Sequence, residues 1–227
     1  MLVLNRNGGK LDYQALMEGD RRYQKLPKFD DAYKEHILNK RQIWENLSQL
    51  TPQDARNTII EFLKAWKIRY TARIKPIKLK EKLRKLNAHF QVFRNDCLIA
   101  LDFDREVTLN NQRMKFSEVI KEIYRELCGK KDKKIEIKGI KGIGPTAASK
   151  ILHGVNPQVF MVWDEAIRNG YGYAGNEVGY LKFMKKAREI LLRMASHLRE
   201  VDKSATKLLD EYNYMKFTRG EDLPDPF

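Results

Sequence analysis

The chain contains two glycines, two residues apart, at a spacing that is typical of phosphate-binding turns. Gly142 and Gly144 stand in the stretch "KGIKGIGPTAASKIL" (residues 138–152), just before a run of small residues that reads as the start of a helix. Glycines at this spacing let the backbone turn sharply and leave amide N–H groups uncovered at the N-terminus of the helix, where the helix dipole is positive. The stretch is therefore predicted to bind phosphate, and the nearby Lys141 and Lys150 would add Coulomb attraction.

An aspartate follows the glycine pair at a defined interval. Asp164, in "FMVWDEAIR" (residues 160–168), lies 164 − 144 = 20 residues beyond Gly144. An ionised carboxylate beneath a sugar ring lowers the barrier to breaking an N-glycosidic bond, because that step develops positive charge on the sugar. Asp164 could equally be only the N-cap of a helix that begins at Glu165. The residues alone leave both interpretations open.

Two kinds of phosphate site use such a glycine turn, and the surroundings favour one of them. A dinucleotide-binding fingerprint needs a preceding strand and a third glycine, but the third place holds Ala147 and the flanking sequence has a helical pattern. The glycine-hydrophobic-glycine hairpin instead resembles the helix-hairpin-helix motif. With Asp164 at its interval, residues 115–170 resemble the helix-hairpin-helix superfamily of DNA base-excision glycosylases, and residues 52–68 more weakly resemble a helix of its companion lobe.

This resemblance implies a fold, an activity and a set of site residues. The fold would be an all-α, two-lobed helical bundle that forms one domain over residues 1–227, with the motif at 138–152. The activity would be hydrolysis of the N-glycosidic bond of a damaged or modified base in duplex DNA, with Asp164 as the catalytic carboxylate. The residues expected to clamp the DNA backbone are Lys141, Gly142, Gly144, Thr146 and Lys150.

Departures from the family pattern narrow the expected activity. Thr146 stands where the bifunctional glycosylases carry a catalytic lysine, and the four-cysteine cluster of one branch is missing because the chain has only two cysteines. Without an amine at position 146, no Schiff base forms by the usual route, so a monofunctional glycosylase is expected. Lys150 lies one helical turn beyond Thr146 on the same face and could bring an amine to the site, although contact with phosphate is favoured for it.

An enzyme of this kind must hold the extruded base between aromatic and apolar side chains. The candidates are Trp163 beside Asp164, Tyr171 just beyond it, and Trp66 at the border of a basic stretch. Packing in the core is the alternative for each of them. Neither the two cysteines nor the four scattered histidines show metal-ligand spacing, so no metal and no cofactor are expected, apart from a monovalent cation that could sit at the hairpin.

The charge distribution favours a polyanionic partner. Lysine and arginine exceed aspartate and glutamate by 44 − 30 = 14, and residues 67–94 carry ten basic residues against the single acid Glu81. Residues 130–141 add six basic residues against two acids. Double-stranded DNA is the expected partner. Three alternatives stay open: solvated helix faces without a partner, a noncatalytic helix-hairpin-helix DNA-binding protein, and an RNA-binding protein.

Helical periodicity dominates the rest of the chain. Thr51-Pro52 followed by Asp54 predicts a helix start. Apolar stripes at helical spacing are expected over residues 116–127 and 183–198.

Two segments fall outside this helical pattern. Residues 98–114 fit either a hairpin that turns at Asn110-Asn111 or an irregular loop. Residues 219–227, with two prolines and three acids, are expected to form a flexible acidic tail. No stretch approaches the roughly 20 apolar residues of a membrane span, so we expect an intracellular, cytoplasmic monomer that is associated with the nucleoid and makes no membrane contact.

Overall fold

The computed structural model describes residues 11–129, 139–198 and 203–227, and this part of the chain is mostly helical. The basic residues 130–138, including the first residue of the predicted phosphate-binding stretch, lie outside the described residues. None of the described helices is both long and apolar enough to cross a bilayer.

The helices and strands have the following bounds. The α-helices are α1 (Tyr13–Tyr23), α2 (Pro27–Tyr33), α3 (Arg41–Glu45), α4 (Pro52–Asp54), α5 (Glu61–Ala65), α6 (Pro76–Lys85), α7 (Asn87–Gln91), α8 (Phe116–Leu127), α9 (Pro145–Val155), α10 (Glu165–Gly170), α11 (Glu177–Leu192), α12 (Ala195–Leu198) and α13 (Ala205–Asn213). The strands are β1 (Glu106–Leu109) and β2 (Gln112–Lys115). Short 3-10 or π-helical turns cover Lys34–Leu38, Leu47–Gln49, Ala55–Ile60, Thr71–Arg73 and Tyr214–Thr218.

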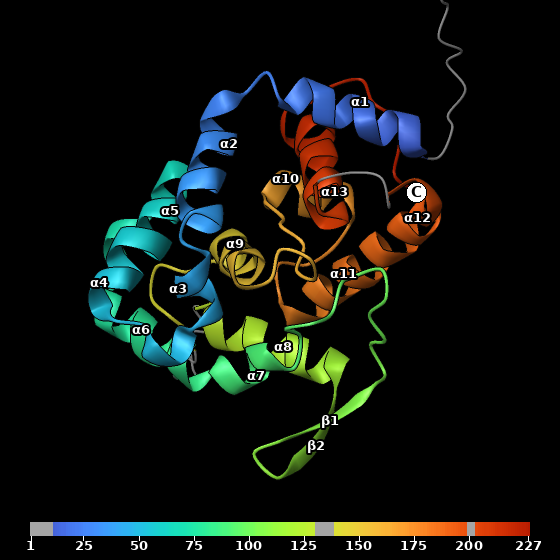
Figure 1. The fold of residues 1–227 in the computed structure, drawn as a ribbon. Helices are drawn as coiled ribbons and strands as arrows, with labels where there is room; N and C mark the ends of the chain where they lie inside the picture. Colours follow the sequence, from blue (N-terminus) through green and yellow to red (C-terminus); the bar gives the residue numbers. More distant parts are fainter. Residues whose placement is uncertain (1–10, 130–138, 199–202) are drawn as a thin grey trace, which may run out of the picture.

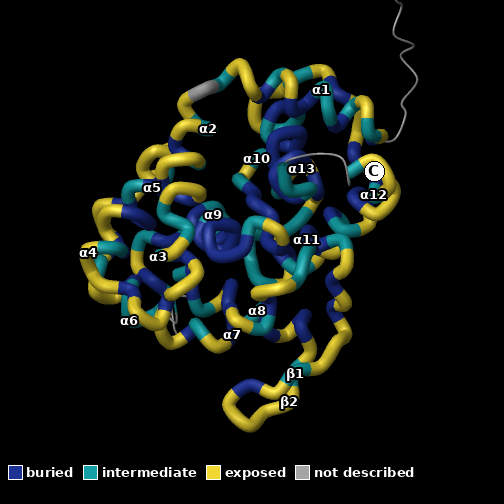
Figure 2. Tube along the Cα trace, viewed as in Figure 1, coloured by how far each residue is buried: buried dark blue, intermediate teal, exposed yellow. Residues whose placement is uncertain are grey.

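Helix α9, which begins directly after the glycine pair, lies in the middle of the molecule (Figure 1). In this view α3 to α6 lie to its left, α2 lies above it, α8 lies below it, α11 lies to its right, and α1 and α13 lie above it and to its right. Eight of its eleven residues are buried, and its trace is almost entirely buried in Figure 2. The predicted phosphate-binding turn is therefore attached to the central helix of the fold.

The predicted helix start at residue 51 is confirmed, with the expected cap. The Thr51 hydroxyl accepts a hydrogen bond from the Asp54 amide at 3.1 Å, and the Asp54 carboxylate accepts one from the Thr51 amide at 3.1 Å. This reciprocal pair satisfies two amides that the first turn leaves without partners. The helix then continues through the π-helical turn Ala55–Ile60 into α5.

The two apolar stripes are found where the sequence predicts them, with one difference. The stripe over residues 116–127 is the buried face of α8. The stripe over residues 183–198 is divided, because α11 ends at Leu192 and α12 begins at Ala195. Met194 remains buried in the connection, so the apolar periodicity continues across the break.

The structure resolves the alternative left open for residues 98–114 in favour of a hairpin. Strands β1 and β2 pair antiparallel, with Leu109 opposite Gln112. The two residues of the turn, Asn110 and Asn111, have φ angles of 50° and 64°. Asparagine tolerates this left-handed conformation better than most residues, which is why two asparagines can close a two-residue hairpin.

The C-terminal segment differs from the expected flexible tail. Leu223 is buried, the Leu11 amide donates to the carbonyl of Asp225 at 2.9 Å, and Arg193 donates to the carbonyl of Pro226 at 3.2 Å. The Tyr171 and Phe227 rings also meet edge to face. The prolines and acids indicated a loose segment, but its backbone carbonyls and apolar side chains find partners on elements distant in sequence, which composition cannot reveal.

Candidate active site

The two glycines of the hairpin have different local roles. Gly142 has φ +96°, a left-handed conformation that favours glycine, and an added Cβ would lie 3.0 Å from the carbonyl oxygen of Tyr70. Gly144 is the N-cap of α9 with φ −92° and ψ −174°, a conformation open to any residue, and nothing lies within 4 Å of its added Cβ. Gly142 therefore makes the turn, whereas Gly144 keeps open the surface in front of the helix.

The hairpin is held against the C-terminal end of α8. The Gly129 amide donates to the carbonyl of Ile143 at 2.9 Å, and the Ile140 amide donates to that of Leu127 at 3.2 Å. An added Cβ on Gly139 would lie 2.3 Å from the Cys128 backbone. This close approach fixes the glycine turn relative to α8.

A groove of about 500 Å³ runs along the hairpin, and we call it the hairpin groove. It contains both glycines and the start of α10. The basic residues Lys67, Arg69 and Arg168 line it, together with the acids Asp164 and Glu165. The complete lining is Lys67, Ile68, Arg69, Tyr70, Gly142, Gly144, Pro145, Thr146, Ala147, Asp164, Glu165, Ala166, Arg168 and Thr218.

A second hollow of about 240 Å³ shares part of this lining, and we call it the aromatic cavity. Its walls carry the rings of four residues from α1, α2, the end of α5 and the segment after α13. The lining is Tyr23, Phe29, Trp66, Lys67, Ile68, Thr146, Lys150, Val162, Asp164, Ile167, Asp210, Tyr214 and Thr218. The cavity is smaller than the roughly 300–1,000 Å³ of a typical small-molecule pocket, a size that suits a single ring system.

Asp164 lies where the hairpin groove and the aromatic cavity meet, since it lines both. One carboxylate oxygen accepts a hydrogen bond from the Ile167 amide at 2.9 Å, which makes Asp164 the N-cap of α10. The other accepts from the Thr218 hydroxyl at 2.6 Å. The capping interpretation is therefore confirmed, and the same geometry holds the carboxylate beside both hollows.

Lys150 does not lie where a phosphate contact was expected. It lines the aromatic cavity and not the hairpin groove. Its amine donates to the carbonyl of Trp66 at 3.1 Å and lies 4.7 Å from the centre of the Trp66 ring. Burial lowers the pKa of Lys150 to about 8, although the charges of Asp210 and Asp164 act in the opposite direction. Thr146, one turn earlier on the same face, lines both hollows, so this face of α9 runs from the hairpin groove into the aromatic cavity.

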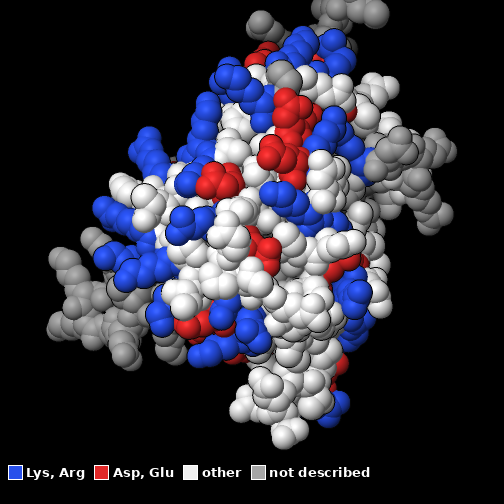
Figure 3. Space-filling model, turned by 60° about the vertical axis from the view of Figure 1, so that its left-hand side comes forward, with Lys and Arg blue, Asp and Glu red and all other residues white. Residues whose placement is uncertain are grey.

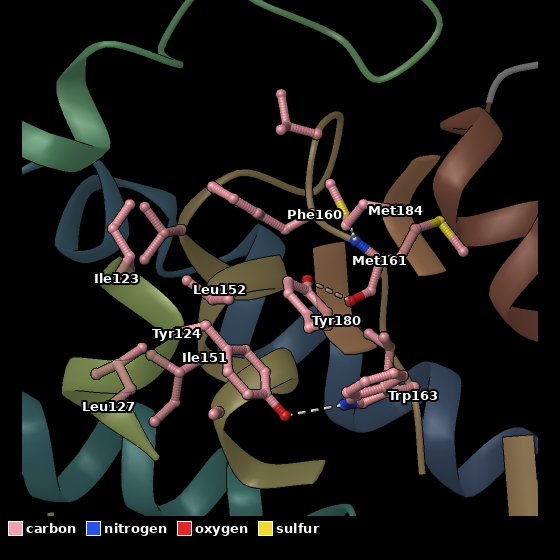
Figure 4. Close-up of a cluster of buried hydrophobic side chains, with 14 of the residues drawn as sticks. Ile123, Tyr124, Leu127, Ile151, Leu152, Phe160, Met161, Trp163, Tyr180 and Met184 are labelled. Atoms are coloured by element: carbon pink, nitrogen blue, oxygen red, sulfur yellow. Dashed lines mark hydrogen bonds between the residues drawn. The ribbon is translucent and has the colours of Figure 1, made fainter. Parts of the chain in front are cut away.

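Of the three candidates for the base pocket, only Trp66 lines the cavity. Trp163 is fully buried, stacks on Phe183, and donates from its ring nitrogen to the Tyr124 hydroxyl at 3.2 Å (Figure 4). Tyr171 is buried as well, and its hydroxyl donates to the Asn213 side chain at 3.0 Å. For both residues the core alternative is therefore correct.

The remaining hairpin residues divide between two surfaces. Thr146 lines both the hairpin groove and the aromatic cavity. Lys141 is exposed and lines a separate hollow of about 350 Å³ between the hairpin and α6, where it lies near Arg73 and Lys75. Figure 3 shows Lys and Arg side chains across the side that carries α2 to α6, with fewer acidic side chains among them. Basic residues therefore flank the hairpin on this side.

Most residues that line the cavity were not predicted from the sequence, and the most distant from the motif are Tyr23, Phe29, Asp210 and Tyr214. They come from α1, α2, α13 and the turn after it, far from the motif in sequence. No spacing signal links these segments to the hairpin, so only the fold identifies them.

No cluster of three or more His, Cys, Asp or Glu side chains able to hold a metal occurs within residues 11–129, 139–198 and 203–227. The chain matches no protein-family model, and searches of curated proteins and of solved structures find no match either.

Proposed function

We propose that this protein is a DNA glycosylase of the helix-hairpin-helix type, which cleaves the N-glycosidic bond of a damaged or modified base. One observation carries the proposal: Asp164 lines both the hairpin groove and the aromatic cavity. A nucleotide with its phosphate at the hairpin and its base in the cavity would have its sugar beside this carboxylate. In this proposal the helices form the two-lobed bundle of that family, and the protein acts as a monomer on chromosomal DNA without a cofactor.

Binding would begin at the hairpin groove. The amides at the start of α9 face an open surface at Gly144, and a phosphate there would also meet the positive end of the helix dipole. Lys67 and Arg69 also line the groove. These groups contact the backbone and read no base, so the affinity for undamaged duplex should be independent of its sequence.

The aromatic cavity would receive the extruded base. Trp66 and Phe29 line it, and flat rings of this kind hold a base by stacking. A damaged or mismatched base is extruded at lower cost than a normal pair, which contributes to selectivity.

In the cleavage step Asp164 would stabilise the positive charge that develops on the sugar. The expected monofunctional activity depended on the lack of an amine at the site, but the Lys150 amine lies in the same cavity. With a pKa of about 8, roughly a tenth of this amine is neutral at pH 7. We therefore propose that Lys150 attacks C1′ of the sugar while the electron pair of the C1′–N bond leaves with the base. Loss of the proton from the amine and opening of the ring would then give a Schiff base.

The test is a screen of duplexes that each carry one modified base, assayed for strand breaks at abasic sites after alkali. The proposal predicts excision of at least one modified base. Binding of duplex DNA without excision of any base would favour a noncatalytic DNA-binding protein, and a preference for RNA over DNA would favour an RNA-binding protein.

Asp164→Asn gives the sharpest test of the catalytic role. Asparagine keeps the oxygen that caps α10 but removes the charge, so excision should fall about 100- to 1,000-fold, while the melting temperature and duplex binding stay close to wild type. The matched control is Asp12→Asn, because Asp12 caps α1 in the same way, accepting from the Ala15 amide at 2.8 Å, and does not line the cavity. Equal activity in the two variants would mean that Asp164 only caps α10 and has no catalytic role.

A further inference from the structure

A second carboxylate, Asp210 on α13, lines the aromatic cavity together with Asp164. Asp210 is only 5 % exposed. The charges that act on its carboxyl come from Lys207 on the same helix, Lys150 on α9 and Asp164 at the start of α10. It therefore lies at the inner end of the site, among the groups that the proposed reaction uses.

The Asp210 carboxylate has no bonded partner among the described residues. Asp164 uses one oxygen for the Ile167 amide and the other for the Thr218 hydroxyl, whereas the Asp210 side chain makes no hydrogen bond or ion pair within the part of the chain that the structure describes. The Asp210 oxygens are not among the fully buried side-chain atoms that lack a partner, so the carboxylate keeps some contact with the open space of the cavity. A group that borders a cavity and lacks partners indicates that the ligand supplies them.

A purely structural role for Asp210 as counter-ion of Lys207 is already filled by other residues. The Lys207 amine lies 2.6 Å from a carboxylate oxygen of Glu211 and 3.5 Å from one of Asp30. Lys150 is likewise held, through its bond to the carbonyl of Trp66. Both lysines therefore have bonding partners other than Asp210.

We propose that Asp210 binds the Watson–Crick edge of the extruded base by accepting two N–H hydrogen bonds, so that the cavity selects a base of the guanine type. This inference depends on the proposed function, because it assigns the substrate class of the same site. A carboxylate can accept two parallel N–H bonds with its two oxygens. Guanine-type bases present two adjacent donors, the N1–H and the 2-amino group, whereas adenine and cytosine present one donor beside an acceptor, and uracil and thymine place a single N–H between two acceptors.

The pKa of Asp210 agrees with such a role. Burial raises the pKa of Asp210 to about 7, although Lys207 and Lys150 lower it. Two N–H donors would favour the ionised form and bring this pKa down again when the base is bound. The aromatic rings of Trp66 and Phe29 would hold the faces of the base while Asp210 reads its edge.

Binding of free bases tests this inference without requiring excision. The protein is bound to a duplex with one tetrahydrofuran abasic analogue, which cannot form the Schiff base. Then 9-methylguanine or 9-methyladenine is added, and binding is followed by the fluorescence of Trp66, the only tryptophan lining the cavity. We expect 9-methylguanine to bind at least about tenfold more tightly than 9-methyladenine, as a bidentate contact provides. Asp210→Asn should lose that preference, because its amide replaces one acceptor by a donor. The control is Asp222→Asn, an exposed carboxylate outside the site.

Equal affinity for the two bases, a preference unchanged in Asp210→Asn, or no binding of either base would each overturn the inference. The two proposals also fail separately. If the screen finds excision of modified pyrimidines or adenines only, the glycosylase proposal stands and the role of Asp210 is wrong. If 9-methylguanine binds through Asp210 but no duplex is ever cleaved, the recognition site stands and the glycosylase proposal fails.

Discussion

Lys150 and Thr146 lie one turn apart on α9, and both line the aromatic cavity. The short hydroxyl side chain of Thr146 and the long amine side chain of Lys150 therefore lie on the same face of the helix. The amine lies against the Trp66 ring rather than in solvent. Burial lowers the pKa of a lysine enclosed in this way, which increases the neutral fraction of its amine near neutral pH.

Borohydride trapping tests the proposed role of Lys150. With a duplex that the protein cleaves, or one with an abasic site, we expect a covalent protein-DNA adduct that disappears in Lys150→Ala. Because the amine is charged below its pKa and neutral above it, the trapping rate should rise as pH increases and level off above about 8.

The control for this experiment is Lys64→Ala, which removes an exposed lysine on α5 outside the cavity and should trap normally. An abasic product without any trapped adduct, and with activity intact in Lys150→Ala, would contradict the proposed role of Lys150 and support a monofunctional glycosylase. The amine would then have only a positioning role beside Trp66.

At the scale of elements, α9 has a glycine at each end with opposite surroundings. Gly144 faces open space at the N-terminus, whereas an added Cβ on Gly154 would lie 2.6 Å from the ring of Trp44. The first glycine opens a surface, and the second permits the close packing of α9 against α3. Alanine at position 144 should therefore affect DNA binding, whereas alanine at position 154 should affect stability.

We expect Gly154→Ala to lower the free energy of unfolding by about 1–3 kcal/mol, the usual cost of overpacking, as measured by thermal or urea denaturation. Gly144→Ala should keep wild-type stability, since its backbone is extended and its Cβ position is empty. Its methyl group should instead weaken duplex binding severalfold by covering the amides that meet phosphate. Unchanged affinity in a stable Gly144→Ala protein would argue against phosphate binding at the hairpin.

The C-terminal segment behaves as a structural element, which gives a second prediction at this scale. Leu223→Ala should lower the free energy of unfolding by about 2 kcal/mol or more, because the side chain is 6 % exposed. The neighbouring Asp222→Ala serves as the control, since Asp222 is exposed and should tolerate the change. Equal melting temperatures for the two variants would support a loose tail.

The whole molecule carries a formal net charge of +14, and basic residues border both the hairpin groove and the hollow beside α6. Part of this positive charge is neutralised locally, because Glu126 and Glu81 form ion pairs with lysines of α6. Binding of a polyanion to such a surface releases condensed counterions, so its affinity depends on salt.

The salt dependence of duplex binding follows from this charge. If the surface makes about six phosphate contacts, affinity for unmodified duplex should fall by roughly three decades between 50 and 200 mM salt. Fluorescence anisotropy with a labelled duplex would measure it. An affinity that does not change over this range would remove the electrostatic basis of DNA binding.

The sequence by itself determined the local features of this protein. The glycine turn, the Thr51 cap, the hairpin at Asn110-Asn111 and the buried face of α8 follow from φ preferences and from contacts within one turn. The N-cap role of Asp164 is local in the same way and is confirmed, whereas its catalytic role, which came from a family resemblance, stays a prediction. Such features are encoded within a few residues, which is why a pattern can predict them.

Only the tertiary structure decided which side chains line the aromatic cavity. Trp163 adjoins Asp164 but packs in the core, whereas Trp66 and Asp210 reach the cavity from 98 residues before Asp164 (164 − 66) and 46 after it (210 − 164). The direction of Lys150 likewise depends on α9 being the central helix. Which side chains meet at a cavity depends on how helices pack over long separations, and no periodicity within one segment contains that information.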